Sequence, residues 1–139
     1  MAEDREIYEI LDKLGLDDEE IKSINKRNKL LNETTAEEVS DIVNFFSIKC
    51  KLDEDDIARV IIKNPFILNE SFDRINMLAE IYEKVGFSEQ EYKDYIVNCD
   101  KAFSANPKDV VSGINAMINS GKEMKAVKEL MLDRPDRIF

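Results

Sequence analysis

Residues 52–86, LDEDDIARVIIKNPFILNESFDRINMLAEIYEKVG, contain the pattern that decides the fold. Ile57 and Ile61 lie four residues apart in an apolar run, which is the spacing of a helix with one buried face. Pro65 follows that run at a point where a helix has to stop, because proline has no N–H to donate. A second run at helical spacing includes Leu78. The stretch therefore predicts two amphipathic helices separated by a proline turn.

The same pattern recurs along the chain at an interval of about 35 residues. Three columns of equivalent positions are apolar in every copy. They hold Ile57, Tyr92 and Val127; Ile61, Ile96 and Met131; and Leu68, Phe103 and Ile138. One helix pair cannot bury its own apolar stripe, but stacked neighbours can. We therefore predict an all-α fold, a short right- or left-handed solenoid of about four helix-pair repeats.

The repeat divides the single helical domain, 1–139, into a cap at 1–15, three units at 16–51, 52–86 and 87–121, and a partial unit at 122–139. Polar residues at helix starts predict caps: Asp17, Asp53, Asn106, and two capping boxes formed by Thr35 with Glu38 and by Ser88 with Glu91. Glycines and prolines predict stops and turns. The predicted turn and cap residues are Gly15, Pro65, Ser71, Gly86, Ser88, Pro107, Gly121 and Pro135.

The charge balance restricts the class of partner. The chain has 30 acidic and 20 basic residues, a net charge of -10, with no basic tail. Such a balance repels phosphate at long range, and it favours a protein partner or a local basic patch in an acidic envelope. The beginning of the sequence has no basic and apolar leader, and no apolar run is long enough to cross a membrane. We expect an intracellular, cytoplasmic protein without a membrane partner.

The residue types also argue against catalysis. The chain has no histidine, and Cys50 and Cys99 stand alone, which excludes a zinc site of the usual Cys/His kind. We expect both cysteines to be ordinary buried residues within helices. The acids at 53–56 lack the glycine and distal glutamate of a calcium loop, and no phosphate-binding glycine loop is present. We expect no enzyme, metal, cofactor or small-molecule substrate. Most aromatic residues fit apolar columns or junctions, which predicts core positions for most of them rather than exposed platforms for stacked bases. These residues are Tyr82, Tyr92, Tyr95, Phe45, Phe46, Phe66, Phe72, Phe87 and Phe103.

The densest group of basic residues lies in the sequence SINKRNK, residues 23–29. One interpretation is a solvated helix face with local ion pairs. The other is a phosphate-binding path, because point charges at neighbouring helix ends track a nucleic-acid backbone well. The candidate nucleic-acid-binding residues are Lys22, Lys26, Arg27, Lys29, Arg59 and Lys63.

Residues 52–86 resemble the repeat of the mTERF (mitochondrial transcription termination factor) family. That repeat has an apolar first helix, a proline before an apolar triplet, a polar cap, a second amphipathic helix and a closing glycine. The matching residues are Ile57, Ile61, Pro65, Phe66, Leu68, Ser71, Leu78, Val85 and Gly86. The resemblance implies a curved solenoid that binds nucleic acid along a positively charged concave path.

Two functional hypotheses remain open at this point, both for a non-catalytic binding scaffold. One is a nucleic-acid-binding regulator of transcription or of mobile elements, which the resemblance favours. The other is an acidic protein–protein interaction module or inhibitor that docks on a basic partner. The charge of -10 favours the second, since the nucleic-acid binders of the family are basic.

Overall fold

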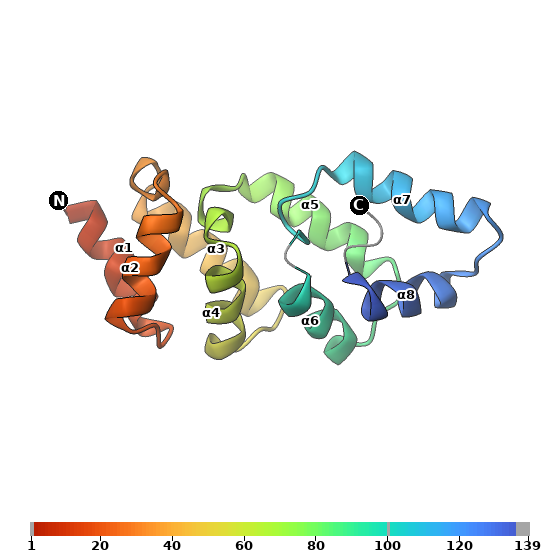
Figure 1. Ribbon diagram of the computed structural model, residues 1–139, viewed down its shortest axis with the longest axis horizontal. Coiled ribbons are helices and arrows are strands. Elements are labelled where there is room, and N and C mark those ends of the chain that lie inside the picture. Colours follow the sequence, from red (N-terminus) through yellow and green to blue (C-terminus); the bar gives the residue numbers. More distant parts are fainter. Residues whose placement is uncertain (1, 100, 136–139) are drawn as a thin grey trace. The chain divides into compact units, whose positions relative to one another are not determined.

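The computed structural model describes residues 2–99 and 101–135, and within them the regular secondary structure is entirely helical (Figure 1). The all-α prediction is confirmed. In chain order the elements are α1 (Ala2–Lys13), α2 (Asp18–Arg27), the 3₁₀ turn η1 (Leu31–Glu33), α3 (Ala36–Ile48), α4 (Glu54–Lys63), the 3₁₀ turn η2 (Pro65–Asn69), α5 (Phe72–Glu83), α6 (Glu89–Asn98), α7 (Pro107–Asn119) and α8 (Met124–Asp133).

The chain forms two compact units, Met1–Phe72 (unit 1) and Asp73–Phe139 (unit 2). In unit 1, α1 packs against α2 and α3, while α4 packs against α2 and α3. The two 3₁₀ turns η1 and η2 also pack together. Leu11, Val39, Phe46, Ile61 and Leu68 are completely buried in this core. These residues include members of two of the predicted columns, so the repeat correctly identified the packing face.

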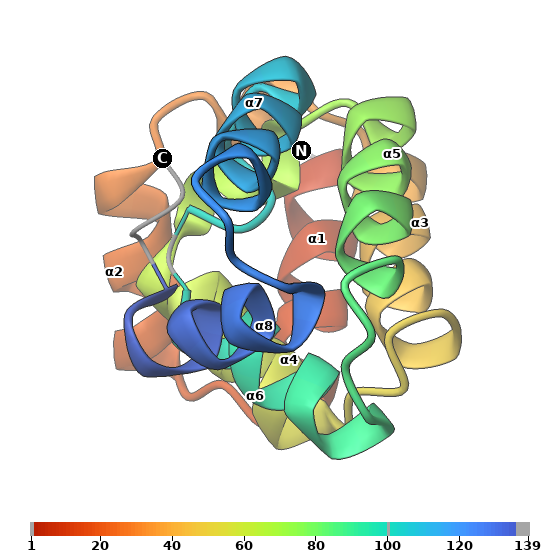
Figure 2. The same ribbon diagram turned by 90° about the vertical axis from the view of Figure 1, so that its right-hand side faces the viewer.

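Unit 2 has a core centred on aromatic rings. The Tyr82 ring from α5 makes edge contacts with Tyr95 of α6, at 5.1 Å between ring centroids, and with Phe103, at 6.0 Å. Its hydroxyl donates a hydrogen bond to the carbonyl of Ala102. Figure 2 shows α6 and α8 side by side, and α8 is in contact with both α6 and α7. Val127 and Met131 of α8 are completely buried, as their columns predict.

Most predicted stops and caps are confirmed. Gly15, Gly86 and Gly121 have φ values of +90°, +94° and +97°, in the left-handed region where glycine carries no steric penalty. Ser88 forms a full capping box with Glu91, and Pro107 is the first residue of α7. Pro65 starts η2, and Ser71 directly precedes α5. Ile138, in the last apolar column, lies outside the described residues.

Three sequence interpretations need correction. Thr35 caps α3, because its hydroxyl accepts from the Glu38 N–H. A capping box also requires the Glu38 carboxylate to accept from the Thr35 N–H. Instead, that carboxylate accepts from the hydroxyl of Thr34. A side chain of the preceding residue thus competes successfully for that carboxylate.

Two of the aromatic residues expected in the core, Phe66 and Phe72, are 47% and 45% exposed. Cys50 and Cys99 are buried and form no disulfide, but each lies just after a helix and not within one as expected.

Candidate nucleic-acid interface

The helices α2 and α4 carry acids at their beginnings and bases at their ends. Asp17 and Asp53 cap them through the N–H groups of Glu20 and Asp56, and each first turn contains three acidic residues. The last turns contain Lys26 and Arg27 in α2 and Lys63 in α4. Both placements suit the helix dipole, which is positive at the N-terminus and negative at the C-terminus. Each helix is therefore polarised in charge along its axis.

Arg27 holds the C-terminal ends of α2 and α4 together. Its Nη1 donates to the carbonyl of Ile62 at 2.6 Å, and its Nη2 donates to the carbonyl of Lys63 at 3.3 Å. Those carbonyls belong to the last turn of α4, where the helix supplies no N–H partner of its own. Arg27 thus caps the C-terminal end of the neighbouring helix α4 with N–H groups of its guanidinium.

A buried asparagine extends this contact into the turns that follow. The Asn28 side chain, in a residue 1% exposed, donates to the Pro65 carbonyl at 2.9 Å and to Asn69 Oδ1 at 2.7 Å. Asn69 in turn donates to the Leu30 carbonyl at 2.7 Å. These bonds fix η2 against the segment that leaves α2, so the ends of the two helices and their turns form one connected structure.

Sequence reasoning did not single out Asn28, although a signal was available. Asn28, Asn64 and Cys99 fall at equivalent positions, one residue before the proline column or its equivalent in each repeat. In unit 2 the Cys99 thiol approaches the Pro135 carbonyl at 3.6 Å, which repeats the Asn28 contact with Pro65. A polar or thiol donor in this column therefore marks a joint between successive repeats.

The predicted basic residues divide into two groups. Lys26, Arg27, Lys29 and Lys63 come together at the joined C-terminal ends of α2 and α4, and all four are exposed. We call these four residues the basic edge. Lys22 and Arg59 lie about one turn farther back along the same helices, and Arg59 forms an exposed pair with Asp56 at 3.9 Å. All six residues thus lie on two neighbouring helices of unit 1 or directly after them.

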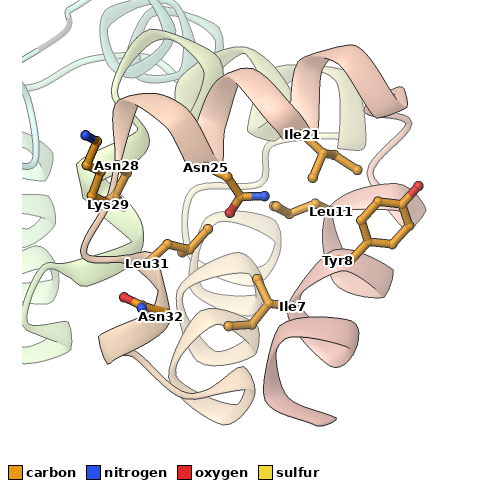
Figure 3. A pocket seen from close by; sticks show the side chains of 9 residues that line it. All are labelled: Ile7, Tyr8, Leu11, Ile21, Asn25, Asn28, Lys29, Leu31 and Asn32. Carbon is orange, nitrogen blue, oxygen red and sulfur yellow. The ribbon is translucent and has the colours of Figure 1, made fainter. Parts of the chain in front are cut away.

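A half-open pocket of about 440 Å³ lies beside the basic edge, among α1, α2 and η1. Ile7, Leu31 and Asn25 point toward the same space from these three elements in Figure 3. Leu11 and Ile21 complete an apolar floor, and Lys29 belongs to both the pocket lining and the basic edge. The pocket thus opens next to positive charge.

At the rim of this pocket, Tyr8 is tied to the acidic end of α2. Its hydroxyl donates to the Asp18 carboxylate, and this hydrogen bond is the main reason that the pKa of Tyr8 lies above its ordinary value.

In unit 2 a second hollow of about 480 Å³, lined by Lys101, Asn106 and Asp109, lies where α7 begins.

Three of the acidic residues that the sequence singles out have a structural use. Among the described residues, no group of three His, Cys, Asp or Glu side chains is arranged to hold a metal ion. Asp17, Asp53 and Glu91 serve helix N-termini instead. Within the same residues, no helix is both long and apolar enough to cross a membrane.

Recurring helix pairs, joined by matching contacts after their first helices, define the class: an all-α helical-repeat protein. A sequence profile of the mTERF family matches residues 2–130, and the chain belongs to that family. No curated protein matches the chain significantly. Membership suggests a helical-repeat protein that binds nucleic acid, and members of the family are generally binding scaffolds rather than enzymes.

Proposed function

We propose that this protein is a non-catalytic scaffold that binds nucleic acid on the basic edge of unit 1 and acts inside the cell as a regulator of transcription or of mobile elements. One observation carries the proposal. The two hydrogen bonds from Arg27 to α4 bring Lys26, Lys29 and Lys63 to the same edge. Family membership supports a nucleic-acid ligand over other anions.

The separation of charge along each helix explains how a chain of net charge -10 can attract phosphate locally. Asp18 and Arg27 are the first and last residues of α2, which places them roughly 13 Å apart along a helix that rises about 1.5 Å per residue. Charges in solvent are screened beyond roughly 8 Å at physiological ionic strength. A phosphate at the basic edge is therefore affected by the nearby lysines more than by the acids at the far helix ends.

The experiment compares two variants with the same net charge. One replaces Lys26, Lys29 and Lys63 of the basic edge by alanine; the matched control replaces the exposed lysines Lys108, Lys122 and Lys125 of unit 2. Both are titrated with single- and double-stranded oligonucleotides at about 50 and 200 mM salt. Wild type and control should bind with a steep salt dependence. The unit 1 variant should bind more weakly, with a log-log salt slope smaller by roughly 0.9 for each duplex phosphate that it no longer neutralises.

Absence of binding by the wild type at low salt would contradict the proposal. Equal weakening in the two triple variants would contradict the location, because it would reflect net charge alone. Circular dichroism and thermal melting establish that each variant remains folded.

A second candidate function follows from the opposite ends of the same helices. Asp18, Glu19, Glu54 and Asp55 are exposed there, in the first turns of α2 and α4. This acidic end favours a module or inhibitor that docks on a basic protein. A lysine-rich peptide serves as the probe. Binding that disappears when Glu54 and Asp55 become Gln and Asn, together with no binding of oligonucleotides, favours this second function.

A further inference from the structure

Phe66 points outward from an otherwise buried turn. Pro65, Ile67 and Leu68 are buried, but Phe66 is 47% exposed. Leu30, at the equivalent position of the preceding repeat, is 48% exposed. Single exposed apolar side chains are common on protein surfaces, so the surroundings of Phe66 decide what its ring can do.

The hydrogen bonds around Asn28 place this ring at the basic edge. Asn28 bonds the carbonyl of Pro65, the residue directly before Phe66, and Arg27 bonds the carbonyl of Lys63. Asn69, at the end of the same turn, bonds the Leu30 carbonyl. The turn that carries Phe66 therefore borders the basic edge.

We infer that Phe66 is a stacking platform for an unpaired base of single-stranded nucleic acid whose phosphates lie on the basic edge. The inference rests on the proposed function and adds the strand type. An exposed aromatic ring beside positive charge is the arrangement that binds single strands, since every base has a face that can stack. Bases inside a duplex are already stacked on their neighbours, so a duplex gains nothing from the ring.

The turn that carries Phe66 is held in place before any ligand arrives. Proline at the first position of η2 restricts the backbone, and the two bonds from Asn28 fix both ends of the turn. A ring on such a support loses little conformational freedom on binding, which favours affinity.

The chain contains no tryptophan, so Phe66→Trp introduces a single fluorescent reporter. We expect quenching by oligo(dT) or oligo(U), and none by a duplex of equal length. The control is Ile48→Trp. Ile48 is 76% exposed and is the last residue of α3, just before the chain leads into the acidic first turn of α4. The control should show no quenching by either ligand.

Affinity provides the second test. Phe66→Ala should weaken binding to the single strand by roughly five- to a hundredfold and leave duplex binding unchanged. Phe66→Leu keeps the apolar bulk but has no ring, so a similar loss of affinity in this variant points to stacking and not to a folding effect. The control Ile48→Ala should bind as the wild type does.

The two proposals fail in different ways. If the wild type binds oligonucleotides with steep salt dependence, but Phe66→Ala binds equally well and the fluorescence of Phe66→Trp is not quenched, the platform is wrong and the proposed function stands. If the wild type binds neither strand type at low salt, both are wrong.

Discussion

The side-chain amide of Asn28 donates to the main-chain carbonyl of Pro65 across 2.9 Å in the interior of unit 1. The two residues lie in successive repeats, and the same amide also bonds Asn69. Asn28 and Thr34 are the only buried polar residues among those with described burial. This joint leads to the first prediction.

Asn28→Ala should lower the free energy of unfolding by about 2 kcal/mol, because it leaves the Pro65 carbonyl and the Asn69 amide oxygen without their donor. Urea denaturation measures the change. The matched control is Asn25→Ala, at an exposed position near the end of α2, which should change stability by less than about 0.5 kcal/mol. Equal effects of the two substitutions would show that the joint contributes nothing.

Gly86→Ala tests the left-handed turn between α5 and α6. A Cβ at this glycine meets no atom within 4 Å, so the cost comes from the backbone alone at φ +94°. We expect the free energy of unfolding to fall by about 1–2 kcal/mol in a thermal or urea melt. Glu83→Ala, at an exposed helical position nearby, should be nearly neutral. A neutral Gly86→Ala variant would mean that the turn adopts another conformation at little cost.

Glu91 should give unit 2 a pH-dependent contribution to stability. Hydrogen bonding from the Ser88 N–H, and next from Lys128 at 3.2 Å, lowers the pKa of Glu91 below 4.5. A lowered folded-state pKa means that the contribution is complete above about pH 4.5 and is lost as the pH falls through the folded-state value. The melting temperature of Glu91→Gln should therefore lie below that of the wild type at neutral pH and approach it in acid. The exposed Glu129→Gln serves as the control, and a pH-independent difference would contradict the assignment.

Tyr82 should act at the opposite end of the pH scale. Burial raises the pKa of its phenol above the ordinary value of 10.0. Stability from this group is therefore complete below about pH 10 and is lost as the pH rises further. Alkaline unfolding, followed by absorbance of tyrosinate, should occur at higher pH in Tyr82→Phe than in the wild type, after allowance for the missing bond to Ala102. Titration of all four tyrosines without unfolding would contradict this prediction.

The sequence predicted the packing of this protein better than its binding surface. Ile57, Tyr92 and Val127 share a column and are all buried, because helical periodicity reports directly which face is apolar. Capping at Asp17, Ser88 and Asn106 was also predictable, since it involves residues at most three positions apart. The family resemblance, which rested on these local patterns, is confirmed over residues 2–130.

The arrangement at the candidate interface was less accessible to sequence reasoning. Arg27 was identified as a basic residue, but its bonds to Ile62 and Lys63 join residues 35 and 36 positions apart. Phe66 was placed with the core because its apolar neighbours belong there, and only the geometry of the 3₁₀ turn shows that it faces outward. Whether the six predicted basic residues bind nucleic acid stays a prediction.

The joints after α2 and α6 have a consequence for how the molecule responds to force. In both, the acceptor is a main-chain oxygen of a proline, which substitution cannot remove, so their strength depends on the donor. Asn28 supplies an amide with two N–H groups, whereas the Pro135 carbonyl accepts from the Tyr95 hydroxyl at 3.2 Å and from the weakly polar Cys99 S–H at 3.6 Å. Under mechanical load in an optical trap, we expect unit 2 to yield at its joint before unit 1. Replacing Cys99 by Asn should reduce that difference in rupture force.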